Sequence, residues 1–427
     1  MIYENQRLSC DARLGIEGQN DTLNLMLYRL LRVTSITDAS GAKVNFTQKV
    51  VSFQGLEALQ VNHIQIPIGE STQANTTLKI NYEGMILGYT VTGMSYAKDK
   101  ISPDFTILRM DAFAYPVKGM PSAAGMGELT LQSFDYSISA TVPDSLKAVT
   151  LGKLVGAEQN EGTIKYKYES IVPSWRIDMA IAKYSTLSFD NLKVHYFEED
   201  SAGAQRVYTA LQQTKVLYDS WLGKKDLKNF TAIEIPDGYG SQADLVGVIQ
   251  TASAFKEPEY IYEFYHELSH LWNIPHTDKS PCRLESEGLA MFLQYLVTGR
   301  FENNDYLEKM AQATLESVNK RLLKSTTFES TPIIEYGEKG LTGYSYTKGM
   351  LFFYTLYHMV GEQEFFNAIK GYYAEYKDTG STTKEFAEYL KKTINTHSVD
   401  KLINDWIYTN QSSATLLSCK TAEELWK

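Results

Sequence analysis

The sequence predicts an α+β multidomain protein, in which an N-terminal antiparallel β-sandwich or saddle precedes a domain that ends in a helical part. Residues up to about 187 contain short segments in which apolar and polar side chains alternate. Strand and helix patterns then follow one another up to about residue 256, and from Tyr306 onward the patterns are almost wholly helical. We therefore expect a β domain over residues 1–187 and a second domain over 188–427, with a mixed sheet over about 188–256 and a helical part over about 257–427.

The strands expected in the first domain are short and end at turn residues. The clearest are Thr77 to Tyr82, Tyr136 to Val142 and Thr163 to Tyr168, with Gly84 and Gly162 among the residues that punctuate them. Alternation with period two is typical of an antiparallel sheet that faces the core on one side and water on the other. The first domain is therefore expected to be an antiparallel β structure.

The second domain is expected to begin with a mixed sheet. Strand patterns cover Leu192 to Phe197, Phe230 to Ile235 and Leu245 to Phe255, and a helix over Ala204 to Leu222 lies between the first two and ends before Gly223. A strand, a helix and a further strand in this order indicate a sheet that leads into the helical part.

Three features describe the helical part. A helix of about four turns is expected to begin near Pro258, because proline fits a first helical turn, and to be stopped by Asn273-Ile274-Pro275. A second helix, apolar nearly all round, is expected over Leu284 to Val297, ending before Gly299. Thr382 and Glu385 have the spacing of a capping box.

The composition excludes several classes of function. The formal net charge is −10 and no stripe of Lys and Arg is present, so neither nucleic acid nor an anionic membrane surface is expected as a partner. The longest uncharged apolar stretches, Gly288 to Gly299 and Gly349 to Gly361, are shorter than the about 20 residues that a transmembrane helix needs. No transmembrane segment is expected.

The sequence favours a cytoplasmic location. Residues 1–7 lack the basic start and apolar run of a signal peptide. Cys10, Cys282 and Cys419 are widely spaced, which fits reduced thiols better than disulfides. An extracytoplasmic location is the alternative if a signal or membrane anchor was removed.

The residues His266-Glu267-Leu268-Ser269-His270 have the pattern H-E-x-x-H. On a helix this spacing places both imidazoles on one face, one turn apart, where they can bind the same zinc ion. Glu267 then lies beside the metal, where it can take a proton from water whose pKa zinc lowers to about 7. The motif predicts one zinc ion per chain.

A catalytic zinc usually has three protein ligands, so a third is expected from another segment. Glu285 and Glu287 are the candidates, because both lie at the start of an apolar helix where a buried carboxylate needs a cation. Helical phase does not separate them, since apolar residues follow each glutamate at helical spacing.

Three stretches resemble the zinc aminopeptidases of the gluzincin clan, of the aminopeptidase N and leukotriene-hydrolase type. They are His266 to Asn273, then Ser286-Glu287-Gly288-Leu289-Ala290, which is similar to the family's Asn-Glu-Gly-Phe-Ala, and Tyr344 to Gly349, which is similar to its Tyr-x-Lys-Gly. The resemblance implies a thermolysin-like catalytic domain in which Glu287 is the third ligand. It also implies that Tyr346, with Tyr344 as the alternative, donates a hydrogen bond to the tetrahedral intermediate.

A fourth stretch departs from the family. Gly247-Val248-Ile249-Gln250-Thr251 stands where the family has Gly-x-Met-Glu-Asn on an edge strand beside the zinc, whose glutamate binds the free amino terminus of the substrate. Gly247 and Gln250 are thus the expected substrate-binding residues. Because Gln250 is neutral, losing a charge pair at about 4 Å weakens the amine contact by up to roughly 4 kcal/mol at an effective dielectric constant near 20.

The sequence therefore predicts a zinc metallopeptidase with a peptide as its substrate. His266, His270 and Glu287 bind the metal, Glu267 is the general base and Tyr346 stabilises the oxyanion. An aminopeptidase-like exopeptidase is the first expectation. The alternatives are an endopeptidase with an open cleft and a degenerate gluzincin that serves as a binding or scaffold module.

Overall fold

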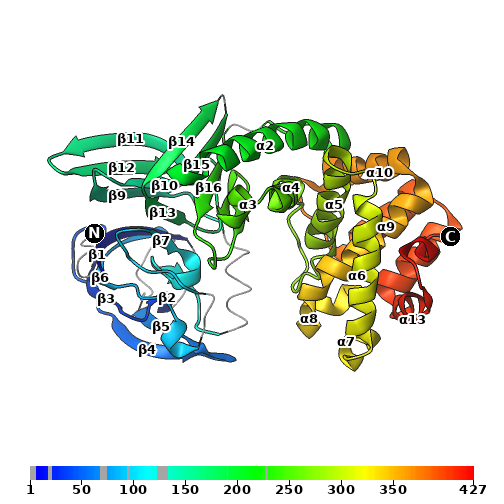
Figure 1. Cartoon of the computed structure of the whole chain (residues 1–427). Coiled ribbons are helices and arrows are strands. Elements are labelled where there is room, and N and C mark those ends of the chain that lie inside the picture. The colour runs from blue at the N-terminus through cyan, green and yellow to red at the C-terminus, as the bar shows by residue number, and fades with distance from the viewer. Residues whose placement is uncertain are drawn as a thin grey trace. The chain divides into compact units, whose positions relative to one another are not determined.

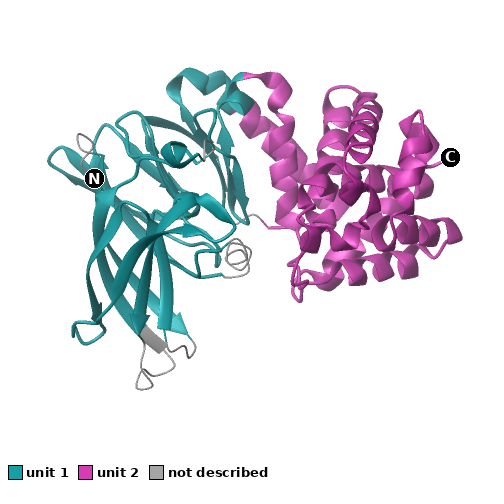
Figure 2. Ribbon diagram, turned by 90° about the horizontal axis from the view of Figure 1, so that it is seen from below, with its two compact units in different colours: residues 1–204, 228–256 teal, residues 205–227, 257–427 magenta. Residues whose placement is uncertain are grey.

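The computed structural model describes residues 6–17, 22–67, 75–93, 97–122, 133–189, 191–226 and 229–427. The chain forms two compact units (Figure 2). Unit 1 consists of Met1–Ala204 and Lys228–Lys256, and unit 2 consists of Gln205–Leu227 and Glu257–Lys427. In this grouping the mixed sheet belongs to the same unit as the preceding strands, and the domain boundary at residues 187/188 stays a prediction.

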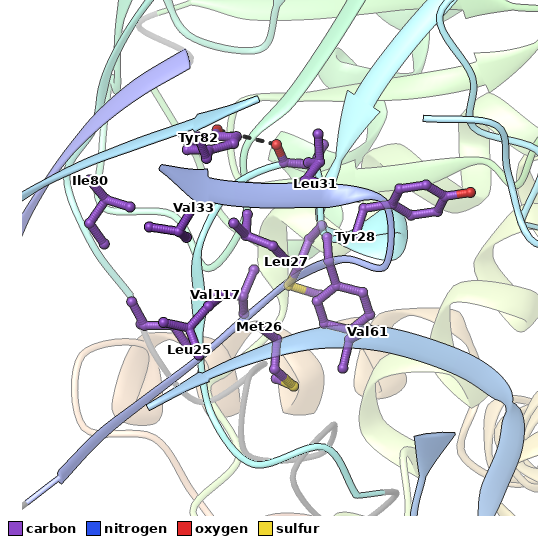
Figure 3. Packing of buried hydrophobic residues seen from close by; sticks show 14 of the residues in the cluster. Leu25, Met26, Leu27, Tyr28, Leu31, Val33, Val61, Ile80, Tyr82 and Val117 are labelled. Atoms are coloured by element: carbon purple, nitrogen blue, oxygen red, sulfur yellow. Dashed lines mark hydrogen bonds between the residues drawn. The ribbon is translucent and has the colours of Figure 1, made fainter. Parts of the chain in front are cut away.

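Two antiparallel sheets in unit 1 enclose an apolar core. One has the order β1 (Arg7–Glu17), β6 (Asn75–Met85), β3 (Leu31–Asp38), and the other has the order β4 (Thr47–Phe53), β5 (Leu56–Pro67), β2 (Thr22–Tyr28), β8 (Val117–Lys118). Side chains from both sheets meet in the core, among them Leu25, Val33, Val61 and Ile80 (Figure 3). Their burial on one face explains the alternating sequence pattern.

Two smaller antiparallel sheets follow in the same unit. The first has the order β10 (Lys147–Thr150), β13 (Asp178–Ala182), β7 (Thr106–Arg109). The second has the order β11 (Lys153–Asn160), β12 (Thr163–Glu169), β9 (Ser137–Pro143). The expected strands of the first domain thus lie in β6, β9 and β12.

The mixed sheet of unit 1 has five strands, in the order β14 (Tyr184–Phe189), β15 (Leu192–Phe197), β16 (Phe230–Ile235), β18 (Gly247–Thr251), β17 (Gln242–Asp244). Strands β15, β16 and β18 are parallel, and β14 and β17 pair antiparallel at the two edges. The strand expected over Leu245 to Phe255 is too long. It ends at Thr251, because the Ser253 N–H donates to Asp237 Oδ1 (2.8 Å) and begins the short helix α3 (Ser253–Lys256).

Helices make up almost all of unit 2 (Figure 1). Helix α2 (Ser201–Leu222) enters it from unit 1. The others are α4 (Tyr262–Ser269), α5 (Leu289–Phe301), α6 (Tyr306–Leu322), α7 (Thr326–Ser330), α8 (Tyr336–Lys339), α9 (Ser345–Val360), α10 (Glu362–Tyr376), α11 (Thr383–Ile394), α12 (His397–Ile403) and α13 (Gln411–Ser418). The capping box of Thr382 and Glu385 is confirmed at the start of α11.

Helix α5 continues two residues beyond Gly299, where an end was expected. Gly299 is not among the residues with positive φ, and its neighbours Val297 and Thr298 are buried. A glycine ends a helix when it adopts the left-handed conformation, and Gly299 does not. The fold class is confirmed, since β-sheets at the N-terminal end are followed by a helical C-terminal part. Within the described residues, no helix is both long enough and apolar enough to cross a membrane.

Lys348 of α9 is a fully buried cation in unit 2. Its Nζ donates to Ser413 Oγ (3.4 Å) and lies 5.6 Å and 6.0 Å from the ring centres of Phe328 and Tyr336. No carboxylate forms an ion pair with it in the described part of the chain, and burial is the one influence on its pKa. Burial lowers the pKa of Lys348 to about 8.

Lys348→Met is expected to stabilise the protein at neutral pH by about 2–4 kcal/mol, since each unit of pKa lowering corresponds to about 1.4 kcal/mol. Between pH 8 and about 10.4 the folded protein releases this proton while the unfolded chain keeps it. The stability of the wild type should therefore rise with pH in that range, and the Lys348→Met variant should lack this part of the rise.

Urea unfolding at several pH values tests this prediction. Lys309→Met is the control, because Lys309 is exposed on the surface. Equal stability of the wild type and the Lys348→Met variant at pH 7 would contradict the prediction.

Candidate metal centre

The H-E-x-x-H motif lies at the end of a helix that is shorter than expected. Pro258–Tyr260 form a turn of 3₁₀ helix, α4 has only eight residues, and a second 3₁₀ turn begins at His270. The four-turn α-helix expected from the sequence is therefore divided into three parts. The two imidazole rings nevertheless remain on one face, with ring centres 4.9 Å apart.

Glu287 faces both histidines. Its Oε2 lies 3.3 Å from Nε2 of His266 and 3.6 Å from Nε2 of His270. The carboxylate comes from a π-helical turn, Leu284–Gly288, that precedes α5. Glu285 of the same turn contacts Cys282 Sγ through Oε2 (4.0 Å) and lines a small cavity instead. The structure thus distinguishes the two glutamates that sequence periodicity left equivalent.

A close contact between two glycines allows α9 to place Tyr346 beside His266. Gly288 and Gly349 touch, so that a Cβ built on Gly349 would lie 2.9 Å from the Cα of Gly288. Only glycine allows this approach of the Glu287 turn to α9. The Tyr346 ring then lies parallel to the His266 ring, with an interplanar angle of 5° and ring centres 6.1 Å apart. Tyr344 stacks on Phe328 (3.9 Å) and is not part of this arrangement.

The charges at the site favour the ionisation states that metal binding needs. Burial by itself raises the pKa of Glu287, but contact with His266 and the charges of His270 and Arg283 lower it to about 2. Burial lowers the pKa of His270, which favours the neutral imidazole. Glu287 is therefore an anion and His270 a neutral imidazole at neutral pH.

Glu267 and Tyr346 have the protonation behaviour expected of a base and a hydrogen-bond donor. Burial, helped by the charges of Glu287 and Glu263, raises the pKa of Glu267 to about 7 although His270 lowers it. A base works best when its pKa is near the working pH. Burial and the charge of Glu287 raise the pKa of Tyr346, which keeps its phenol protonated.

Asn273 holds the ring of His270. Its side-chain amide lies 3.0 Å from Nδ1 of that histidine. The atom that faces Nδ1 is the amide nitrogen Nδ2. Metal binding through Nε2 leaves the proton on Nδ1, and this N–H would donate a hydrogen bond to the amide oxygen once the amide is turned by 180°. Sequence analysis did not select Asn273, although its place directly after Trp272 within the resembling stretch was a signal.

The donor atoms fit a metal ion. The ligand atoms of His266, His270 and Glu287 all lie within 4.8 Å of one another, and no other group of three such side chains is found in the described part. Donors around a tetrahedral zinc at about 2.0–2.1 Å are about 3.4 Å apart, close to the two distances from Glu287. Oε2 of Glu287 is buried and has no hydrogen-bond partner among the described residues. A cation between these atoms would satisfy all three.

The two expected substrate-binding residues lie in β18 of unit 1. A Cβ on Gly247 would lie 2.1 Å from the carbonyl oxygen of Thr231, so the close approach of β16 already requires glycine there. Strand β18 is not an edge strand, because β17 covers it. The pairing ends at Gln242 and Ile249, and Gln250, 1% exposed, lies beyond it. That Gly247 and Gln250 bind the substrate stays a prediction.

A network of buried charges fixes the hairpin that contains β17 and β18. Arg109 forms hydrogen bonds to both carboxylate oxygens of Asp99 and donates to the carbonyl oxygen of Gly240 (2.9 Å). Arg176 pairs with Asp178 and donates to Gln242 Oε1 (2.7 Å). Because the two arginines and their aspartates are buried and hydrogen-bonded, the network gives the hairpin one defined position in unit 1.

Residues 242–406 match the model of the peptidase family M1 domain. This range, which is less than half of the chain, is similar to an M1 peptidase domain. All seven candidate residues lie in the matched range, and the family resemblance predicted from the sequence is confirmed there. No curated protein sequence matches the chain.

Solved structures share the fold of this chain over almost all of its length. An M1 zinc metallopeptidase from Deinococcus radiodurans, with a Tyr-Ser-Ala substrate bound, has a TM-score of 0.63 at 15% identity, and the match covers 95% of this chain and 90% of that one. Leukotriene A4 hydrolase from Saccharomyces cerevisiae has a TM-score of 0.66 at 16% identity, covering 96% of this chain and 66% of that one.

Proposed function

We propose that the protein is a zinc-dependent metallopeptidase. The observation that carries the proposal is the convergence of His266, His270 and Glu287 in an M1 peptidase domain, with Glu267 and Tyr346 beside them. Two imidazoles and one carboxylate are a ligand set typical of catalytic zinc. The named M1 neighbour is a zinc enzyme, which supports zinc as the metal here.

Different side chains of this protein have different roles in hydrolysis. Zinc bound at such a site lowers the pKa of water and polarises a carbonyl oxygen. Glu267 accepts the proton of the attacking water and then transfers it to the leaving amine. Tyr346 donates a hydrogen bond to the oxygen that becomes negative in the transition state. No covalent nucleophile takes part.

The finer proposal is an aminopeptidase-like exopeptidase, as the resemblance implies. A specific observation favours the endopeptidase alternative: Gln250 replaces an amine-binding carboxylate, and Arg283 places a positive charge next to Glu287. A substrate ammonium group is repelled by that charge. The degenerate, non-catalytic module is the weaker alternative, since ligands, base and tyrosine are all present.

One assay tests the function and its finer form together. A fluorogenic peptide with a free amino terminus and its N-acetylated twin are incubated with the protein, each with and without a zinc chelator. We expect hydrolysis that the chelator abolishes and added zinc restores, with the free-amine peptide cleaved faster. Chelator-insensitive cleavage would contradict the metallopeptidase, and equal cleavage of the two peptides would contradict the exopeptidase.

A further inference from the structure

Arg283 stands beside the candidate metal site in an unusual backbone conformation. Its φ of 65° and ψ of 20° are left-handed, which residues other than glycine rarely adopt. It directly precedes the π-helical turn, and its carbonyl oxygen accepts from the N–H groups of Glu287 (3.0 Å) and Gly288 (3.4 Å). Such strained residues and π turns are concentrated at functional sites.

The Arg283 side chain turns back onto the metal site. Its Nη2 donates to Oε1 of Glu287, four residues later. The other oxygen of Glu287, Oε2, faces the Nε2 atoms of His266 and His270. The two oxygens of one carboxylate thus have different partners, a guanidinium on one side and the imidazoles on the other.

The same guanidinium reaches Tyr346. Its Cζ lies 5.7 Å from the centre of the Tyr346 ring, the ring that is parallel to His266. A guanidinium over an aromatic face is attractive, and its planar shape suits both this stacking and a hydrogen bond to a carboxylate. Arg283 therefore contacts both Glu287 and the tyrosine proposed to stabilise the oxyanion.

We propose that Arg283 is a positioning residue of the metal site, which holds Oε1 of Glu287 so that Oε2 is presented to the metal between the two histidines. The proposal rests on the proposed metal site. Removing a partner of this kind from a metal ligand typically lowers metal affinity about 10- to 100-fold. A lysine keeps the charge but lacks the planar fork, so Arg283→Lys should restore only part of the affinity.

Three variants test the proposal by titrating the metal-free protein with Zn²⁺ in competition with a chromophoric chelator. Arg283→Met and Arg283→Gly are expected to bind zinc about 10- to 100-fold more weakly than the wild type, and Arg283→Lys to lie between. Arg300→Met is the matched control. The Arg300 side chain is 44% exposed and pairs with Glu362, much as the Arg283 side chain is 45% exposed and pairs with Glu287. This control should bind zinc like the wild type.

Thermal unfolding of the metal-free variants separates positioning from folding. Glycine adopts a φ of 65° without strain, whereas methionine has the same strain as arginine there. Arg283→Gly should therefore be at least as stable as Arg283→Met and yet bind zinc as weakly. Wild-type zinc affinity in both variants would overturn the proposal. A wild type that binds zinc but cleaves no peptide would remove the proposed peptidase activity and leave the role of Arg283 standing.

Discussion

Replacing Glu267 with glutamine is expected to lower the rate of peptide hydrolysis by about 10²- to 10⁴-fold, the usual contribution of a positioned general base. An amide has nearly the shape of the carboxylate but cannot accept the proton of water or pass it to the leaving amine. Glu267 is not one of the three side chains whose ligand atoms converge, so the metal content should not change.

The measurement is kcat/KM on the free-amine peptide, together with the zinc content of each protein. Glu259→Gln is the control, since that exposed glutamate lies on the turn before α4, away from the motif. Unchanged hydrolysis by the Glu267→Gln protein would show that the mechanism is wrong. Loss of both zinc and activity would instead mean that Glu267 takes part in metal binding.

Replacing Tyr346 with phenylalanine is expected to lower kcat by about 10²- to 10³-fold, the range found when one oxyanion donor is removed. The ring remains to stack on His266, so the fold and the zinc content should be preserved. Because the hydrogen bond strengthens only as the oxygen becomes negative, KM should change little.

Tyr344→Phe is the matched control for this prediction, since it removes the same hydroxyl two residues earlier. Tyr344 stacks on Phe328 and lies under Arg321, so its loss should leave kcat near the wild-type value. A larger loss of kcat in Tyr344→Phe than in Tyr346→Phe would reverse the assignment of the two tyrosines.

The sequence was sufficient where spacing alone determines which side chains share a face. His266, Glu267 and His270 were predicted from their spacing alone, and the structure keeps the two imidazoles on one face although an α-helix of four turns is absent. This spacing survives because a 3₁₀ turn after α4 still brings His270 back over His266.

Periodicity was insufficient where the backbone departs from the α-helix. Glu285 and Glu287 were equivalent by helical phase, and only the family resemblance preferred Glu287. The π turn at Leu284–Gly288 changes the direction of side chains relative to an α-helix, so a period of 3.6 residues could not have separated them. Arg283 was not predicted, since nothing in the sequence shows that its φ is positive and that its side chain therefore turns back toward Glu287.

The N-terminal half was predictable as a class but not in its connections. Alternation placed β6, β9 and β12 correctly, because the buried and half-buried side chains of each strand alternate with exposed ones. Which strands pair depends on contacts far apart in the sequence, such as β1 with β6, and a single sequence does not encode these in a local pattern. Gly247 also depends on such a distant contact. The family resemblance indicated that it binds substrate, whereas the structure shows that the close approach of β16 requires a glycine at this position.

The zinc content of the purified protein, measured by elemental analysis for the wild type, Glu287→Ala and Glu285→Ala, tests the central claim most directly. The account predicts about one zinc per chain in the wild type and in Glu285→Ala, and much less in Glu287→Ala, because only Glu287 presents an oxygen to both histidines. Absence of zinc from the wild type even after reconstitution, or equal zinc in all three proteins, would contradict it.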